Sequence, residues 1–325
     1  MIISRTPLRM SFVGGGSDFK GYYNNHPGAV VSTALDQYIY ITVNKRFIDD
    51  IRVGYSQIEE VHSVDEIKHN LVRESLKTVG GIDKSVDIVY MSDMLPANEG
   101  SGLGGSSSLT VGTLHALHAF KGQFVSAETL AKQACNIEID VLGHPIGKQD
   151  QYIAAFGGFN YIKFNSDDTV FVNPIILRKD LKEQLKNRLL LFYTNLNTRS
   201  DTILTEQKAN IPKTNKTLDR MVDLAGNLYS NLSNGDIETF GEILHENWVL
   251  KKSLASKVSN PEIDMLYENA LNAGAIGGKI LGSGGGGFLL FYCKEENQDR
   301  LRNSLGLREV SFDFEPEGSK IIYFN

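Results

Sequence analysis

The pattern of apolar positions divides the first half of the chain into strands and helices. Residues 28–35 and 38–44 are rich in β-branched and aromatic side chains, which predicts two strands. Apolar residues recur at helical spacing through 64–79 and 126–142, and glycines follow both stretches, which predicts two helices that end there. Strands and helices thus alternate along this half without a regular repeat.

The second half shows the same mixture of patterns. Residues 189–193 form an unbroken apolar run that is typical of a buried strand. Two long amphipathic stretches, 217–233 and 236–256, predict helices, and a short strand is expected at 320–324. The chain therefore has helices and strands in both halves, which indicates the α+β class.

A polar stretch separates the two halves. Residues 165–169 read Asn-Ser-Asp-Asp-Thr between two more apolar regions. We therefore expect a boundary near residue 170, with one domain over 1–170 and a second over 171–325. A chain of 325 residues is long enough for two domains of this size.

The charge and the cysteine content narrow the class of protein. A net charge of −6 argues against a general nucleic-acid binder, but a few local cations suffice for an anionic substrate. Two cysteines far apart in sequence, Cys135 and Cys293, indicate a reducing compartment. The N-terminus has no signal-peptide pattern, and no apolar run approaches the roughly 20 residues that span a bilayer. We expect a cytoplasmic protein with no nucleic-acid or membrane partner.

A glycine- and serine-rich stretch, residues 100–108, carries the strongest chemical signal. It reads Gly-Ser-Gly-Leu-Gly-Gly-Ser-Ser-Ser and lies between a β-rich run at 85–91 and a helical pattern at 109–120. Unpaired N–H groups at a helix start bind anions, and glycines let the backbone approach a phosphate closely. The alternative is a mobile loop with a serine N-cap. No lysine follows the glycines, so the stretch is not a P-loop, and it lacks the dinucleotide-binding spacing.

Two aspartates follow comparable turns. Asp18 ends the stretch 5–18, in which a short strand enters the turn Gly14-Gly-Gly16. It either caps a helix that begins near Phe19 or accepts hydrogen bonds from sugar hydroxyls. Asp150 lies in the first turn of a helix that follows the loop at 143–148, where it either caps the helix or acts as a base in a cleft.

Three further residues and one loop are candidates for the same site. Glu138 lies beside apolar residues near the end of a predicted helix, and Lys148 precedes Asp150 by two positions. Arg199 stands on a polar turn, where it either binds an anion or is solvated. The glycine run in 279–288 leads into an apolar strand without a polar spacer, which indicates a tight turn and not a linker.

These motifs, in this order, resemble those of the GHMP kinases, which include galactokinase, homoserine kinase, mevalonate kinase and phosphomevalonate kinase. Residues 102–108 resemble the family's G-L-G-S-S-A-A loop, although Gly105 stands where a serine is usual. Residues 5–18 resemble the branch with heptose-phosphate and fucose kinases, and Gly15 and Gly16 depart from the galactokinase pattern. Glu138, Gly143, Gly147 and Asp150 match the active-site segment, and 279–288 matches the third motif, K-x-x-G-x-G-G-G-G-F.

The resemblance implies a fold and a role for each residue. The implied fold is the two-domain GHMP architecture, with an N-terminal domain like domain 2 of ribosomal protein S5 and a ferredoxin-like C-terminal α+β domain. The implied cofactors are ATP and Mg²⁺. Asp150 would be the catalytic base, with Arg9 and Lys148 stabilising charge, and Ser106 and Glu138 would hold the metal. The expected nucleotide-binding residues are Gly100, Gly102, Gly104, Gly105, Ser106, Ser107, Ser108, Gly284 and Gly285. The expected substrate-binding residues are Gly15, Gly16, Ser17, Asp18 and Arg199.

The implied reaction is ATP-dependent phosphorylation of the anomeric hydroxyl of a sugar phosphate. The expected acceptor is D-glycero-D-manno-heptose 7-phosphate, which would give the 1,7-bisphosphate for nucleotide-activated heptose and cell-surface polysaccharide. A fucokinase-like enzyme for a neutral sugar is the main alternative. A non-catalytic sugar sensor would need neither Asp150 nor Glu138, and Glu138 with the first motif argues against a diphosphomevalonate-type decarboxylase. Which of Ser106, Ser107 and Ser108 binds Mg²⁺ stays open, as does a homodimer.

Overall fold

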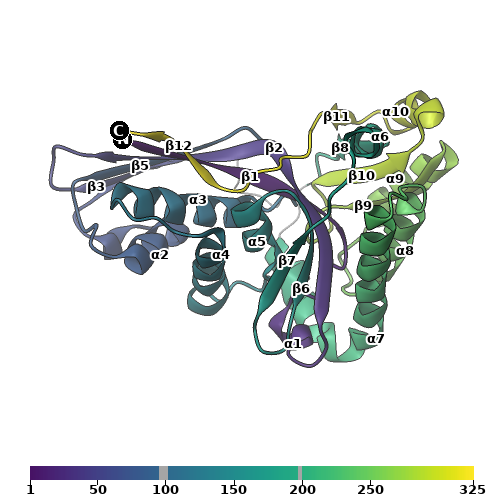
Figure 1. The fold of residues 1–325 in the computed structure, drawn as a ribbon, viewed down its shortest axis with the longest axis horizontal. Coiled ribbons are helices and arrows are strands. Elements are labelled where there is room, and N and C mark those ends of the chain that lie inside the picture. Colours follow the sequence, from purple (N-terminus) through teal and green to yellow (C-terminus); the bar gives the residue numbers. More distant parts are fainter. Residues whose placement is uncertain (95–101, 197–199) are drawn as a thin grey trace.

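The computed structural model describes residues 1–94, 102–196 and 200–325. In these residues the strands form an eight-stranded and a four-stranded sheet, and the helices pack beside them (Figure 1). The predicted α+β class is confirmed. The strands of the large sheet are β1 Ile2–Val13, β2 Gly28–Lys45, β3 Ile51–Gly54, β4 Ile58–Val61, β5 Val86–Ser92, β6 Phe159–Phe164, β7 Val170–Pro174 and β12 Lys320–Phe324. Those of the small sheet are β8 Leu189–Tyr193, β9 Ala275–Ile280, β10 Phe288–Cys293 and β11 Arg308–Val310.

The helices divide between the two sheets. In Figure 1 most helices of the first half lie along one side of the large sheet, and most of those of the second half lie near the small sheet. The long helix α7, Ser200–Ser233, instead contacts β2 of the large sheet. The first group is α1 Lys20–Tyr23, α2 Asn70–Val79, α3 Gly105–Phe120, α4 Ala127–Cys135 and α5 Gln149–Phe156. The second group is α6 Lys179–Asn187, α7 Ser200–Ser233, α8 Phe240–Lys252, α9 Pro261–Asn272 and α10 Gln298–Leu305.

The long strand β2 forms the middle of the large sheet. The order is β12-β1-β2-β5-β3-β4, and the hairpin β6–β7 joins the sheet through β6, which also pairs with β2. The prediction of two strands at 28–35 and 38–44 was wrong, because β2 is continuous. Its register against β1 shifts where Pro7 faces Tyr38 and Leu8 faces Leu35. Proline has no N–H to donate to the ladder, so a bulge here bends β2 without ending it.

Two predicted helices are shorter than the apolar pattern indicates. The pattern at 64–79 divides into a 3₁₀ turn at Val64–Glu66 and helix α2. Ser126, the first residue of the second predicted helix, is the N-cap of α4, since its hydroxyl accepts a hydrogen bond from the Thr129 N–H. The α-helix then stops at Cys135 and continues as a π-helical turn, Asn136–Val141. Apolar spacing cannot separate α from π geometry, and π turns are frequent at functional sites.

In the second half the expected elements are present with changed bounds. The run 189–193 is strand β8, and 320–324 is strand β12. The stretch 217–233 is the last part of α7, which begins at Ser200 and contains Pro212. The stretch 236–256 contains the shorter helix α8.

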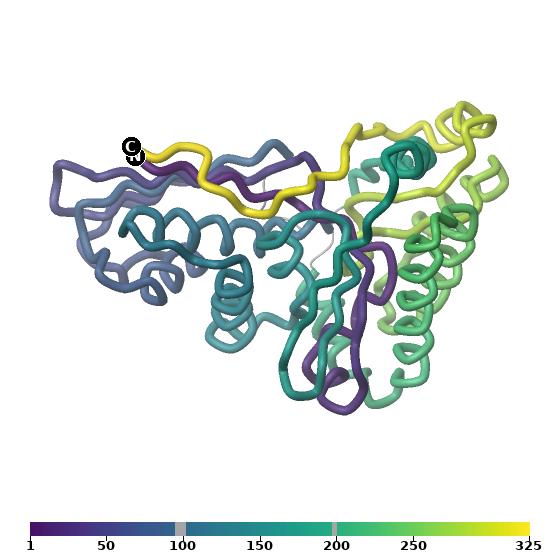
Figure 2. The backbone as a smooth tube through the Cα atoms, viewed as in Figure 1, coloured from purple at the N-terminus to yellow at the C-terminus, as the bar shows by residue number. Residues whose placement is uncertain are grey.

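The chain passes between the sheets after Pro174. The polar residues 165–169 form the turn of the β6–β7 hairpin, in which the Asn165 N–H donates to the Thr169 carbonyl at 3.0 Å. A boundary near residue 170 therefore lies at the second strand of this hairpin. Strand β12 returns to pair with β1, so the two termini lie side by side (Figure 2). The large sheet thus contains the last strand of the chain.

Strand β1 joins the large sheet to the second half. The buried Lys279 ammonium on β9 donates to the carbonyls of Ser11 and Phe12, at 2.8 and 2.9 Å. The Phe12 ring packs edge-on against Phe240 of α8, with ring centroids 5.1 Å apart. These contacts hold the end of β1, which leads into the glycine turn, against β9 and α8. The Arg9 N–H on β1 also donates to the Leu103 carbonyl at 2.9 Å, and Gly102 lies against Leu281 and Gly282. The three glycine motifs therefore meet in one region.

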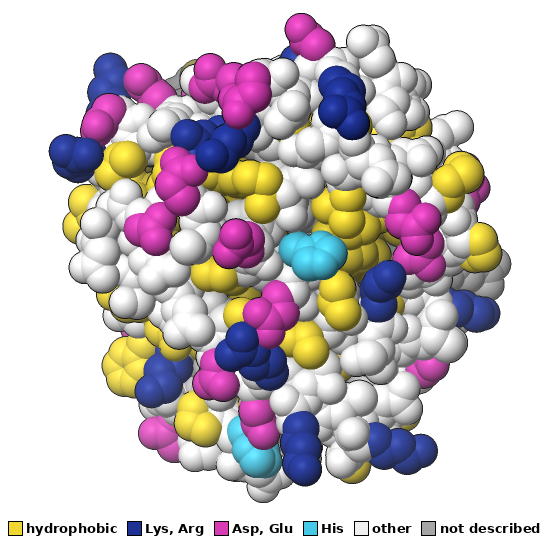
Figure 3. Space-filling view, turned by 90° about the vertical axis from the view of Figure 1, so that its right-hand side faces the viewer, with side chains coloured by type: hydrophobic (Ala, Val, Ile, Leu, Met, Phe, Trp, Pro, Cys, Tyr) yellow, Lys and Arg dark blue, Asp and Glu magenta, His cyan; other side chains and the backbone are white. Residues whose placement is uncertain are grey.

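The surface carries both signs of charge. On the face shown in Figure 3, acidic and basic side chains are interspersed. Within residues 1–94, 102–196 and 200–325, no helix is both long and apolar enough to cross a membrane.

Candidate active site

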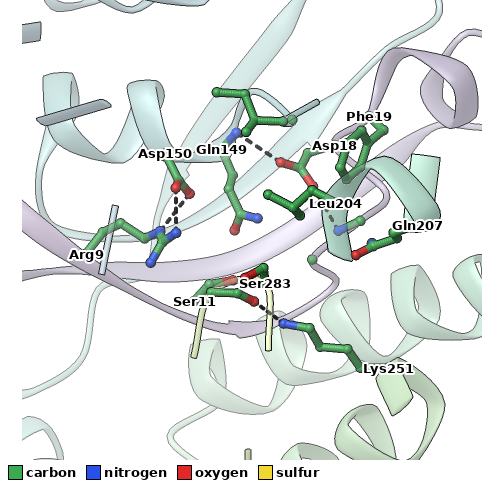
Figure 4. Close-up of a pocket in the computed structure, with 15 residues that line it drawn as sticks. Arg9, Ser11, Asp18, Phe19, Gln149, Asp150, Leu204, Gln207, Lys251 and Ser283 are labelled. Carbon is green, nitrogen blue, oxygen red and sulfur yellow. Dashed lines mark hydrogen bonds and ion pairs between the residues drawn. The ribbon is translucent and has the colours of Figure 1, made fainter. Parts of the chain in front are cut away.

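A pocket lies between the first glycine motif, the first turn of α5, and the helices α7 and α8. Its empty volume is about 540 Å³, open solvent included. Figure 4 shows Arg9 and Asp150 together on one side, while Asp18 and Lys251 enter from other elements. The polar side chains that line it include Arg9, Asp18, Gln149, Asp150, Gln207 and Lys251.

Arg9 and Asp150 form the central ion pair of the pocket. The Arg9 guanidinium donates from Nε and Nη2 to the two carboxylate oxygens of Asp150, at 2.6 and 2.5 Å. The Arg9 side chain is 6% exposed and the Asp150 side chain 22%. A third nitrogen of Arg9 donates to the Gly102 carbonyl. Because the planar fork fixes both oxygens, Asp150 is held in one orientation beside the loop at 102–108.

Asp18 is a buried carboxylate that does not cap α1. The N-cap of α1 is Phe19, without a side-chain hydrogen bond. The Asp18 oxygens instead accept from the N–H groups of Gly16 and Gln149, at 2.9 and 3.2 Å. Burial raises the pKa of Asp18, and these two hydrogen bonds oppose that rise. A Cβ on Gly147 would lie 2.0 Å from an Asp18 oxygen, so only glycine leaves room for this carboxylate.

The other residues of the first motif divide between the pocket and the backbone. Gly15 and Gly16 line the pocket. Ser17 is completely buried, and its hydroxyl donates to the Gly14 and Ala29 carbonyls at 2.8 and 3.0 Å. Ser17 therefore holds the turn in place and does not face the pocket.

The predicted phosphate loop ends at the start of α3. Gly104 is the N-cap with φ +76°, a conformation that favours glycine, and a Cβ there would meet the Arg9 side chain at 2.9 Å. Gly105 opens the helix, so the first N–H groups of α3 are where an anion would bind. Gly102 lies in the described part of this loop, whereas Gly100 lies outside the described residues.

The three serines of this loop have different surroundings. Ser106 is exposed. Ser107 is buried, and its hydroxyl donates to Glu138 at 3.3 Å. Ser108 is also buried, and its hydroxyl donates to the Pro7 carbonyl at 2.7 Å. Ser108 is thus bound to the backbone of β1, while Ser106 and Ser107 lie on the side of Glu138, whose pKa both hydroxyls lower.

Glu138 projects from the π-helical turn and is completely buried. Burial raises the pKa of Glu138 to about 7, against hydrogen bonds from Gln151, at 3.0 Å, and from Ser107. The side-chain oxygen of Gln151 has no hydrogen-bond partner in the described structure. A carboxylate, hydroxyls and an amide oxygen are hard ligands that suit Mg²⁺, which commonly takes one or two carboxylates together with substrate phosphates. These residues fit the metal that the resemblance implies.

The third glycine motif packs backbone to backbone against the phosphate loop. Gly102 has φ +78°, and a Cβ there would lie 2.5 Å from the Leu281 carbonyl oxygen. A Cβ on Gly282 would lie 2.3 Å from the Gly102 Cα. Gly282 and Ser283 line the pocket. Gly284 and Gly285 instead pack against Val258, which lies in the segment after α8. The run is a fixed turn, as its flanking residues predict.

Two lysines near the motifs do not reach the reacting groups in this structure. Lys148 donates from Nζ to Asp168 at 2.6 Å and stacks on the Tyr23 ring, so its expected part in charge stabilisation finds no support in this geometry. Lys279 is bound to backbone carbonyls of β1. Arg199 lies outside the described residues.

Lys251 on α8 is a pocket residue that the sequence reasoning missed. It is 5% exposed, and burial lowers the pKa of its ammonium to about 8. Its Nζ donates to the Gly282 carbonyl. One signal was available, because Lys251 continues the helical spacing of Leu244 and Trp248 and so falls on the buried face of α8. A lysine on such a face is rare unless it has a function or a partner.

Comparisons with known proteins identify the family of this chain. A family model described as the GHMP kinases N terminal domain matches residues 67–158, and one described as GHMP kinases C terminal matches residues 228–309. A D-glycero-alpha-D-manno-heptose 7-phosphate kinase from Campylobacter jejuni is 31% identical over 98% of each chain. A bifunctional fucokinase/GDP-fucose pyrophosphorylase from Arabidopsis thaliana is 27% identical over 92% of this chain and 30% of the relative.

Solved structures of sugar kinases have the same fold as this chain. A D-glycero-D-manno-heptose 1-phosphate kinase from Bacteroides thetaiotaomicron superposes with a TM-score of 0.82 at 25% identity, over all of both chains. Lactococcus lactis galactokinase, solved with galactose, has a TM-score of 0.78 at 17% identity, over 98% and 94% of the chains, which shows the shared fold.

These family models and the heptose 7-phosphate kinase relative show a phosphotransferase with an alcohol group as acceptor. The chain belongs to the GHMP kinase family, whose members are ATP-dependent. Within that family it is a sugar kinase.

Proposed function

We propose that this kinase phosphorylates the anomeric hydroxyl of D-glycero-D-manno-heptose 7-phosphate and forms the 1,7-bisphosphate. The similarity to the Campylobacter jejuni heptose 7-phosphate kinase, over 98% of both chains, carries the choice of acceptor. The pocket supports it, since it combines a base, a buried carboxylate for hydroxyl groups and a buried cation.

Asp150 is the proposed base. It accepts the proton of the attacking hydroxyl as that oxygen bonds to the γ-phosphorus of ATP and the bond between this phosphorus and the leaving oxygen of ADP breaks. Both Asp150 oxygens keep a lone pair beyond the hydrogen bonds from Arg9. Positioning and electrostatics dominate phosphoryl transfer, so the rigid Arg9–Asp150 pair would act chiefly by orienting the acceptor oxygen. Asp18, with Gly15 and Gly16, would bind ring hydroxyls on the other side of the sugar.

The start of α3 is the proposed site of the ATP phosphates. The N–H groups from Gly104 onward would hold phosphate oxygens, and the turn at Gly282 would cover them. Glu138 with Ser106 or Ser107 would hold Mg²⁺, which neutralises phosphate charge when bound. Ser108 is the least suited of the three serines, because its hydroxyl is bound to the Pro7 carbonyl.

A coupled assay of ADP release tests the proposal. The acceptors to compare are heptose 7-phosphate, the same heptose without phosphate, mannose and L-fucose. We expect the highest kcat/KM for heptose 7-phosphate and a product with phosphate at the anomeric carbon, seen by ³¹P NMR. Faster turnover of a neutral sugar would refute the acceptor and leave the sugar-kinase class unchanged.

A fucokinase-like activity is the second candidate. The similarity to the fucokinase-containing relative, 27% identity over 92% of this chain, favours it. The same assay separates the two acceptors, because L-fucose carries no phosphate.

A further inference from the structure

Lys251 places a positive charge in the pocket, and none of the carboxylates in residues 1–94, 102–196 and 200–325 forms an ion pair with it. Its ammonium reaches the pocket from α8 and donates a hydrogen bond to the carbonyl of Gly282. The negative charges of Asp18 and Asp150 raise the pKa of Lys251, but burial and the Arg9 charge outweigh them. A buried ammonium in this state has a strong electrostatic preference for an anion.

The neighbouring cations Arg9 and Lys148 are already paired with carboxylates of the described residues. Arg9 uses two nitrogens on Asp150 and a third on Gly102. Lys148 is paired with Asp168 at 2.6 Å. Among the charged side chains that line the pocket in the described residues, Lys251 is the cation without an ion pair.

We propose that Lys251 binds the phosphate that the acceptor sugar already carries, and so makes this kinase prefer a phosphorylated sugar over a neutral one. This inference rests on the proposed function, in which the acceptor is a sugar phosphate. Lys251 is the specificity-determining residue in this scheme. Its ammonium would donate up to three charge-assisted hydrogen bonds to phosphate oxygens.

The position of Lys251 favours the acceptor's phosphate over the phosphates of ATP. Lys251 lines the same pocket as Asp18, Phe19 and Leu204, which surround the proposed sugar site. The ATP phosphates would bind at residues 104–108, at the start of α3. These residues are not among the described residues that line the pocket. The helix N-terminus supplies its own positive potential there. In Figure 4 Lys251 enters the pocket on the side away from Asp150, so one sugar could place its anomeric end at Asp150 and its phosphate at Lys251.

The test compares Lys251→Met with wild-type enzyme on two acceptors, heptose 7-phosphate and the same heptose without phosphate. Methionine keeps much of the chain length and removes the charge. Lys252→Met is the matched control, because Lys252 follows on the same helix and pairs with Asp264 at 3.1 Å outside the pocket. Thermal unfolding of each variant establishes that it folds, and Lys251→Arg retains the charge if the methionine variant does not fold.

We expect the ratio of kcat/KM values, phosphorylated over unphosphorylated heptose, to fall by about 10- to 100-fold in Lys251→Met, the scale of a lost charge-assisted hydrogen bond. The fall should lie mainly in KM for the phosphorylated sugar, with KM for ATP little changed. Lys252→Met should keep the wild-type ratio, and Lys251→Arg should keep most of it.

Three other results would overturn the inference, and each differs from a failure of the proposed function. Equal losses on both acceptors, or a raised KM for ATP, would place Lys251 at the transferred phosphoryl group. If Lys251→Met does not fold, loss of the acceptor preference in a folded Lys251→Arg variant would also overturn it. A wild-type enzyme that does not favour heptose 7-phosphate would refute the proposed function, and the inference with it, before any variant is measured.

Discussion

Replacing Asp150 by asparagine tests the centre of the proposed mechanism. The substitution keeps the shape of the side chain and one acceptor oxygen but removes the negative charge. Arg9 would keep its contact with Gly102 and one hydrogen bond to the new amide, in place of two to a carboxylate. The geometry of the pocket should therefore survive, while the proton acceptor is lost.

The expected effect on catalysis follows from the role of the group. Loss of a general base costs about 10²- to 10⁴-fold in rate, and a 10²-fold loss corresponds to about 2.7 kcal/mol in the barrier. Stability should fall as well, because the Arg9 side chain is only 6% exposed and would lack a counter-ion. Loss of one such charge-assisted bond costs about 1–3 kcal/mol, so the melting temperature should be lower.

Steady-state ADP release and equilibrium ATP binding separate these effects. We expect kcat to fall at least ~10²-fold, with the Kd for ATP nearly unchanged. Asp168→Asn is the matched control, since it makes the same chemical change at an ion pair with Lys148 outside the pocket. A variant Asp150→Asn that is less stable but keeps most of the wild-type kcat would refute the base, and would leave Asp150 only the role of holding Arg9.

Three further predictions concern the metal site and the loops. Burial raises the pKa of Glu138 to about 7, and only the ionised carboxylate binds a metal, so the Mg²⁺ concentration for half activity should rise as the pH falls through 7. The variant Glu138→Gln should need more Mg²⁺ than wild type at every pH and should lack this pH dependence. Mg²⁺ titrations at several pH values measure both effects, and a variant with the wild-type profile would contradict the prediction. Ser108→Ala should lower the free energy of unfolding by about 1–3 kcal/mol, since it removes the hydroxyl that donates to the Pro7 carbonyl. The Mg²⁺ concentration for half activity should stay as in wild type, and a changed value would indicate that Ser108 binds the metal. Gly102→Ala should reduce both stability and activity, because its φ is +78° and a Cβ would lie 2.5 Å from the Leu281 carbonyl oxygen; an unchanged melting temperature and rate would show that the two loops do not need this close packing.

Local pattern predicted most elements of the fold but not their ends. The Ser126 cap and the buried strand at 189–193 follow from neighbouring residues, and both are present. The continuity of β2 depends on its pairing with β1 and β6, which lie far away in sequence. The π-helical turn that carries Glu138 likewise cannot be read from apolar spacing, because burial of one face is similar in both helix types.

Site residues could be predicted from the sequence where adjacent residues in the same motif identify them. The loop at 102–108, Asp18 and Asp150 each stand in a local glycine context, and the structure brings these three regions together. Lys148 also stands in such a context, but its side chain turns to Asp168. Sequence position brings a side chain near a site, whereas its direction depends on which partner is closest in space.

The sequence by itself determined the α+β class, the family resemblance and the glycine-rich start of α3, because each depends on residues that are neighbours along the chain. Only the tertiary structure decided that Arg9 and Asp150, 141 residues apart, form one ion pair, and that Lys251 enters the same pocket from α8. Such contacts join elements of both sheets through the packing of β1, and no local spacing records them. A long-range ion pair is set by where the core places its elements, so it becomes visible only when the chain has folded.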